Sequence, residues 1–454
     1  FCFGALAYGS FVCEQEENGG LPEREALRDI LYFYVSDYTR EATEQKIRDM
    51  VVPESDFALR IIESDLTDYR YLYRFGEYVT DNEIKTWKHL NTLSEETLQK
   101  MADTYTEGYR IGFKVGNKDI TRKKTVNIRY CLGFEPVIKK AVDNFMKMGL
   151  RPTIYRAAAS ILQGRGMSRV GYYGAAPNKQ YDFDHKDDQA LVFDRRLMQV
   201  HLEALKEGYE KYKKEAAVFG GPAVMEIFGE KPVNLEEKPE ALHLSGEQQK
   251  LMVEYMSASG ELVNQYIRGE ERSFTIIAFP VPEIGEDFSA IFDETVKLNT
   301  LDYALYQRMQ QVIIDTLDKG KYVIVKGMKG NRTNLKVILH PLENPDKQTN
   351  FENCVADVNI PVGEVFTSPV LAGTEGILHV SRVYLRELEF KNLSLTFEDG
   401  MVTDYDCGNF EDREQNRKFV RDNVLFHHDS VPLGEFAIGT NTTAYVMAKK
   451  YGIE

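Results

Sequence analysis

The chain has 454 residues, of which 43% are hydrophobic and 28% charged, so it is long enough for two or three domains with cores of their own. Its 71 acidic residues against 56 basic ones give a formal net charge of −15, which argues against nucleic acid or an anionic membrane surface as the main partner. No run of about 18 apolar residues occurs, so we expect no membrane span, and peptides or small molecules as ligands.

Cysteine usage indicates the redox setting. The five cysteines are scattered, odd in number and form no Cys-x-x-Cys pair: Cys2, Cys13, Cys131, Cys354 and Cys407. This pattern predicts neither a disulfide framework nor a thiolate zinc site, and we expect a reducing, cytoplasmic setting. Residues 1–12 are apolar but lack the basic region and initiating Met of a signal peptide, so we expect the end of a buried helix with further chain upstream.

The first part of the chain is rich in helix formers. Segments 23–36, 80–93 and 94–106 are predicted to be helices. The aromatic run 69–75 could form a binding platform, but such spacing is more typical of packing in a core. We therefore expect residues 1–120 to be a helical N-terminal extension.

A strand, helix, strand order follows. Residues 124–130 alternate like a strand, residues 135–148 carry apolar side chains at helical spacing with Gly149 as a cap, and residues 151–155 form a second strand. This order predicts a parallel sheet. Further strands are expected at 222–228, 274–280 and 322–326, with a helix over 299–317, which gives an α/β domain over residues 121–345 with a mostly parallel sheet.

The pattern changes after residue 345 to short alternating strands. Strands are expected at 377–383, 388–397 and 401–405, followed by a helix at 441–451. We therefore predict a β-rich C-terminal domain over residues 346–454, and a fold class of α/β plus α+β. The acidic segment 181–188 lacks the Gly and the closing Glu of a calcium-binding hand, so we expect a solvated loop there.

Two turns in this last region deliver carboxylates in a similar way. Glu364 follows Gly363 and Pro361, and Glu435 follows Gly434 and Pro432. A glycine permits backbone angles that other residues avoid and a proline stiffens the chain, so each carboxylate is held in one direction. The pair suggests a shared site where oxygen ligands hold a divalent cation. Ordinary turns with solvated glutamates are the alternative.

The motifs around these turns resemble a known family. They are Asn-x-Pro-x-Gly-Glu-Val-Phe-Thr-x-Pro at 359–369, Thr-Glu-Gly at 374–376 and Leu-Gly-Glu-x-Ala at 433–437. They are similar to the thermophilic metallo-aminopeptidases of the aminopeptidase T and aminopeptidase S type. Weaker similarity lies at 127–155, at 279–282 and at 330–335, where Asn334 replaces the family's acid. The resemblance covers about residues 120–454, and the extension before it fits a longer, helix-extended subgroup.

This resemblance implies a function. Glu364 and Glu435 match two glutamate metal ligands, so the chain would bind two divalent ions, zinc or cobalt, with manganese or magnesium as alternatives, and release N-terminal amino acids from peptides as a homodimer. The family also uses a His, a Tyr and a later His-x-Asp after the Leu-Gly-Glu element, and this sequence has no His there.

Two alternatives follow from the ligands that the sequence lacks. We expect either that the chain continues beyond Glu454, or that it is a non-catalytic, family-derived scaffold or assembly subunit. His379, His427 and His428 are expected to be structural or solvated. No serine elbow or phosphate loop is present, and catalytic residues and side-chain specificity stay open.

Overall fold

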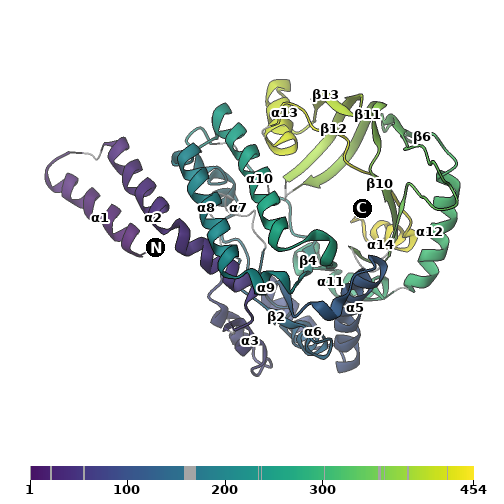
Figure 1. Cartoon of the computed structure of the whole chain (residues 1–454), viewed down its shortest axis with the longest axis horizontal. Helices are drawn as coiled ribbons and strands as arrows, with labels where there is room; N and C mark the ends of the chain where they lie inside the picture. The colour runs from purple at the N-terminus through teal and green to yellow at the C-terminus, as the bar shows by residue number, and fades with distance from the viewer. Residues whose placement is uncertain are drawn as a thin grey trace.

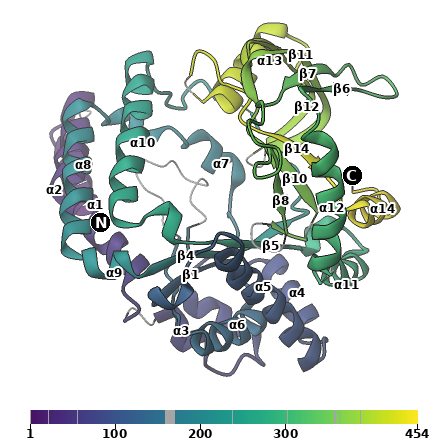
Figure 2. The same ribbon diagram turned by 45° about the vertical axis from the view of Figure 1, so that its right-hand side comes forward.

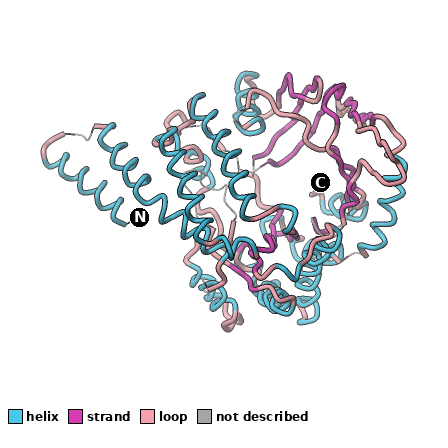
Figure 3. Tube along the Cα trace, in the orientation of Figure 1, coloured by secondary structure: helices cyan, strands magenta, loops and turns pink. Residues whose placement is uncertain are grey.

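The computed structural model describes most of the chain. The described residues are 2–20, 23–54, 57–157, 170–233, 235–236, 238–300, 302–355, 359–361, 363–385, 388–426 and 428–453, without the side chains of 2–7 and 359. The left of the molecule is helical, and most of the long strands gather at the upper right together with further helices (Figure 3). Within the described ranges, no helix combines the length and the apolar character that crossing a bilayer demands.

The N-terminal region is helical, as predicted. Its helices are α1 (Cys2–Glu17), α2 (Arg24–Val51), α3 (Phe57–Ile62), α4 (Asp81–Leu90) and α5 (Glu95–Val115), with a 3-10 helix at Tyr69–Phe75. Helix α1 stands away from the body and contacts α2 (Figure 1). A buried helix was expected over residues 1–12, and the expectation is wrong for residues 8–12, none of which is buried; the burial of residues 1–7 lies outside the description. In the aromatic run, Tyr71 and Phe75 are buried and pack in the core, as expected.

A mostly parallel sheet follows, which confirms the predicted α/β character. Its strands run in the order β2-β1-β4-β5-β9, with β3 also paired to β1. They are β1 (Thr125–Cys131), β2 (Arg151–Thr153), β3 (Tyr172–Tyr173), β4 (Phe219–Phe228), β5 (Thr275–Pro280) and β9 (Asn359–Ile360). Helix α6 (Glu135–Lys147) connects β1 to β2, and Gly149 follows it with φ 81°, which suits a glycine after a helix end.

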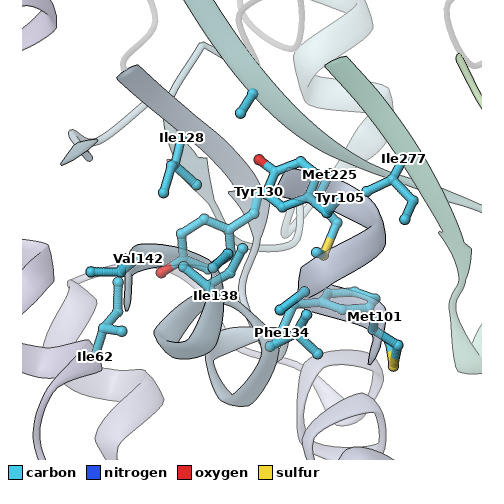
Figure 4. Close-up of a cluster of buried hydrophobic side chains, with 14 of the residues drawn as sticks. Ile62, Met101, Tyr105, Ile128, Tyr130, Phe134, Ile138, Val142, Met225 and Ile277 are labelled. Atoms are coloured by element: carbon cyan, nitrogen blue, oxygen red, sulfur yellow. The ribbon is translucent and has the colours of Figure 1, made fainter. Parts of the chain in front are cut away.

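The main core lies against one face of this sheet. Val126, Ile128 and Tyr130 alternate along β1, are fully buried, and pack with side chains of α5 and α6. Figure 4 shows Ile128, Tyr130 and Ile277 from the sheet together with Phe134 and Ile138. By the same alternation, Asn127, Arg129 and Cys131 of β1 belong to the opposite face of the sheet.

Helices α2, α8 (Arg195–Lys211) and α10 (Gly246–Tyr266) lie side by side (Figures 1 and 2). A smaller core joins α2 and α8 to the sheet, through the buried side chains of Val51, Tyr209 and Phe219. The acidic segment expected to be a loop begins instead as helix α7 (Lys179–Asp184), because the Asn178 side chain accepts a hydrogen bond from the Tyr181 N–H and starts the turn. Short helix α9 (Lys213–Ala217) leads into β4.

The C-terminal region is rich in antiparallel strands, as predicted. A five-stranded sheet runs β13-β12-β11-β7-β6 and a three-stranded sheet runs β14-β10-β8. Their strands are β6 (Tyr322–Lys326), β7 (Asn334–Ile338), β8 (Glu352–Cys354), β10 (Glu364–Thr367), β11 (Val370–Leu385), β12 (Leu388–Glu398), β13 (Met401–Asp406) and β14 (Phe436–Gly439). The remaining helices are α11 (Phe288–Asn299), α12 (Tyr303–Leu317), α13 (Arg413–Val420) and α14 (Thr442–Tyr451).

One expectation about the middle of the chain was wrong. Strand β6 belongs to the antiparallel sheet, because its alternately exposed residues suit an open sheet rather than a buried parallel one. The helix expected over 299–317 is present as α12 but begins later, at Tyr303, since the Asp302 side chain accepts the N–H groups of Ala304 and Leu305 and caps its first turn. The division into domains at 120 and 345 stays a proposal. Strands β6 and β7, before residue 345, belong to the antiparallel sheet, whereas β9, after it, belongs to the parallel sheet.

The start of α10 allows a stability prediction. Ser245 and Gln248 form a capping box, in which the Ser245 hydroxyl accepts the Gln248 N–H at 3.3 Å and the Gln248 side chain accepts the Ser245 N–H at 3.1 Å. We expect Ser245→Ala to lower the free energy of unfolding by about 1 kcal/mol in urea titrations. Ser257→Ala, at an exposed position inside the same helix, is the control. An equal effect of both substitutions would contradict the capping role.

Candidate metal site on two antiparallel strands

The two predicted ligands lie on or beside paired strands. Glu364 begins β10 and pairs with Gly439 of β14, while Glu435 directly precedes Phe436, which pairs with Thr367. The two glutamates are therefore about four residues apart along the strands, roughly 14 Å at about 3.4 Å per residue.

Both glutamates belong to the same face of this sheet. Val365 is fully buried against α12, and Phe436 and Ile438 pack in the same cluster. Because side chains alternate along a strand, Glu364 and Glu435 share the opposite face. Strand pairing thus brings the two motifs of the sequence to one surface.

The charge of Glu435 reaches the Glu364 carboxyl. Burial raises the pKa of the Glu364 carboxyl, and the negative charge of Glu435 raises it further. Glu364 is half-buried and Glu435 is exposed. Two carboxylates that repel each other on one face form a donor pair that a cation would stabilise.

The turn before Glu364 requires its glycine. Gly363 has φ 134°, and a Cβ there would lie 2.7 Å from the Asn441 Cβ. The Thr440 N–H donates to the Gly363 carbonyl at 2.7 Å and ties the turn to the end of β14. The Ile360–Pro361 peptide before it is cis.

The turn before Glu435 does not require a glycine in this way. Gly434 has an ordinary φ, and a Cβ added there would meet nothing within 4 Å. The expectation that the two Gly-Glu turns deliver their carboxylates in the same way is therefore wrong. Glu435 is placed by the pairing of the following strand.

The residues present fit part of a metal site. Glu364 and Glu435 offer hard oxygen donors, but among the described residues no group of three His, Cys, Asp or Glu is gathered closely enough to hold a metal. His379 is buried, and its Nδ1 accepts the Arg332 N–H at 3.2 Å, which confirms a structural role. His428 is exposed, as expected, and His427 lies outside the described residues.

A large cavity opens beside this region. Its volume is about 3210 Å³, and it is lined by the β1-β4-β5 sheet, α7 and α10, the ends of β11 and β12, and α14. Pro361, three residues before Glu364, also lines it. The cavity is thus large enough to take a peptide, and it reaches the turn that positions Glu364.

Comparison with known proteins decides the family. The model of the thermophilic metalloprotease (M29) family matches residues 200–449, more than half of the chain. The chain belongs to this family. The match runs from α8 through α14 and includes both Glu364 and Glu435, so an M29 metalloprotease, a peptide-bond hydrolase, is the context for their chemistry.

The chain can also be compared with curated protein sequences and with solved structures. A search of curated protein sequences finds no match. Among solved structures, wild-type AmpT from Thermus thermophilus is similar, with a TM-score of 0.42 and 15% identity over 76% of this chain and 78% of that chain.

Proposed function

We propose that this M29 protein is a metal-dependent aminopeptidase that releases N-terminal amino acids from peptides. The observation that carries the proposal is the family match, which spans both glutamate motifs. The common face of Glu364 and Glu435 supports it, because it presents two oxygen ligands to one region of space. The neighbouring cavity supplies room for a peptide.

The roles of the chain's own groups follow from this geometry. When bound, a pair of divalent ions supplies a water with a pKa near neutrality and polarises the scissile carbonyl. Glu364 and Glu435 would hold these ions through their carboxylates. Glu364 is itself partly buried, and Gly363 fixes the direction from which its side chain starts.

We further propose that the ions are zinc or cobalt, with manganese and magnesium as alternatives, because carboxylates accept all four. A homodimer in the cytoplasm, acting on peptides and not on nucleic acid or membranes, completes the proposal. The net charge of −15 supports the exclusion of polyanionic partners.

Removal of metal tests the function. We expect chelation to abolish release of the N-terminal residue from a short peptide, and zinc or cobalt to restore it, because the nucleophilic water depends on the ions. The same peptide with an acetylated N-terminus serves as the substrate control and should resist cleavage. Unchanged hydrolysis after chelation, or equal cleavage of the acetylated peptide, would refute an aminopeptidase.

A second function has one observation in its favour. The described residues gather no third ligand around the glutamate pair, which suits a family member that serves as a scaffold or assembly subunit without catalysis. This candidate predicts no hydrolysis of any peptide at saturating zinc or cobalt. Restored activity in the chelation experiment would rule it out.

A further inference from the structure

A pair of arginines lies where the parallel sheet faces the cavity. Arg129 is on β1 and Arg272 precedes β5, and both line the cavity. Val224 pairs with Arg129, Ile276 pairs with Val224 on the next strand, and both line the same wall. Val224 and Ile276 make an apolar stretch of the cavity floor next to Arg129, and Glu226, two residues after Val224 on β4, adds an acidic side chain to it.

Neither arginine is neutralised within the described residues. Arg129 donates from Nε to the Asn127 amide oxygen at 2.8 Å, a neutral partner. Burial lowers the pKa of Arg129 and the charge of Arg272 lowers it further, while only tyrosines act in the opposite sense. Glu271, next to Arg272 in sequence, forms an ion pair with Lys123 at 3.2 Å. Two like charges thus stand together, and neither forms an ion pair with a carboxylate of the described residues, which is costly in a protein.

Unused donors surround the pair. The Arg272 Nε and the Tyr155 hydroxyl are buried, and neither has a hydrogen-bond partner in the described part of the chain. Burial raises the pKa of Tyr155 to about 12, so its hydroxyl stays a donor at neutral pH. The carboxyl that acts on Tyr155 is Asp49, which already accepts a hydrogen bond from Gln45 at 2.7 Å. Tyr155 does not line the cavity, but Arg272 does, and since buried donors normally find acceptors, its unpaired Nε beside a second guanidinium calls for an anion.

We propose that Arg129 and Arg272 form an anion-binding subsite that takes the C-terminal carboxylate of a short peptide. A guanidinium fork matches a carboxylate in shape and charge. Acidic side chains such as Glu226 and Glu283 line the same cavity, which disfavours a polyanion but leaves room for a single carboxylate. The identity of the ligand as a peptide rests on the proposed function.

The sheet sets the length of peptide that would fit. From β1 to β9 there are three strand-to-strand steps, about 14 Å at about 4.8 Å each. An extended residue spans about 3.4 Å, so a peptide of about four to six residues would reach from the arginines to the region of Glu364. The subsite would thus favour short peptides with a free C-terminus.

Binding to the full chain, with metal removed so that no hydrolysis occurs, tests the subsite. Calorimetry would compare a pentapeptide as free acid with its C-terminal amide. We expect the free acid to bind about tenfold more tightly or better, since charge-assisted bonds to the carboxylate are lost in the amide. Arg272→Gln should abolish this difference. Lys179→Gln is the matched control, because Lys179 lines the same cavity but is paired with Glu230 at 3.3 Å.

Other outcomes would overturn the proposal. One is that the two peptides bind with equal affinity or do not bind. Another is that the difference in affinity between them persists in Arg272→Gln. If that variant does not fold, Arg272→Lys, which keeps the charge but loses the fork, must still reduce the difference. An amidated peptide ending in Asp that binds like the free acid would assign the site to acidic side chains instead. This experiment measures binding and not turnover. Failure of the aminopeptidase assay would therefore not change its outcome.

Discussion

Replacing Glu364 with Gln lowers hydrolysis of a leucine anilide by at least about a hundredfold, the loss expected when a group that holds a catalytic metal is damaged. The amide keeps the size of the side chain but removes its charge, so the loss reports on metal binding and not on packing. Glu364 has no hydrogen bond to another described side chain that the change would break. Rates at saturating zinc or cobalt would be compared for the purified variant and the parent protein.

Glu352→Gln is the matched control for this experiment. Glu352 pairs with Phe366, so it shares the face of Glu364 on the same three-stranded sheet, and it is exposed. It lies outside the three motifs shared with the family. We expect its activity to stay within about twofold of the parent, as for most surface substitutions. A similar loss of activity in both variants would mean that removing any charge from this face of the sheet lowers the activity. Glu364 would then have no special role as a metal ligand.

Replacing Glu135 with Gln should remove a large part of the pH dependence of stability. Glu135 begins α6 and is fully buried, where the Tyr71 hydroxyl donates to it at 2.7 Å and the Gly133 N–H at 2.9 Å. Burial raises its pKa to about 7. Below about pH 4.5 the carboxyl is protonated in both folded and unfolded chains. As the pH rises toward 7 the unfolded chain ionises first, so the folded state loses stability, by about 3 kcal/mol in total.

Urea unfolding at about pH 5 and pH 8 measures this effect. The parent protein should lose more stability between the two values than Glu135→Gln does, because the amide does not titrate. Glu95→Gln, at the exposed first position of α5, controls for general charge effects. Parallel pH curves for the parent and Glu135→Gln would show that the buried carboxyl is not the cause.

Local patterns predicted those elements that depend on local physics. The unit of β1, α6 and β2 was predictable because alternation, helical spacing and Gly149 all act within a few residues. Membership of a sheet depends on partners distant in sequence, and β6 was misplaced for that reason. The helix expected from residue 299 begins at Tyr303, because the apolar spacing does not mark Asp302 as the residue that caps it.

The same distinction applies to the candidate site. The sequence indicates Glu364 and the need for Gly363, because the turn is a local feature. That Glu435 shares its face depends on the pairing of β10 with β14, which no spacing in the sequence reveals. The arginine pair was missed altogether, since a single Arg in a strand such as β1 is typical of an exposed position. Only the pairing of β1 between β2 and β4 brings Arg129 to the wall of the cavity.

The central claim is that Glu364 and Glu435 hold the metal of a hydrolytic site. Elemental analysis of the full-length protein after equilibrium dialysis against zinc or cobalt tests it most directly. We predict two ions bound per chain in the parent protein, and clearly fewer in Glu364→Gln and in Glu435→Gln, with Glu352→Gln unchanged. If the variant that carries both substitutions binds as much metal as the parent, the two glutamates are not ligands and the account is wrong.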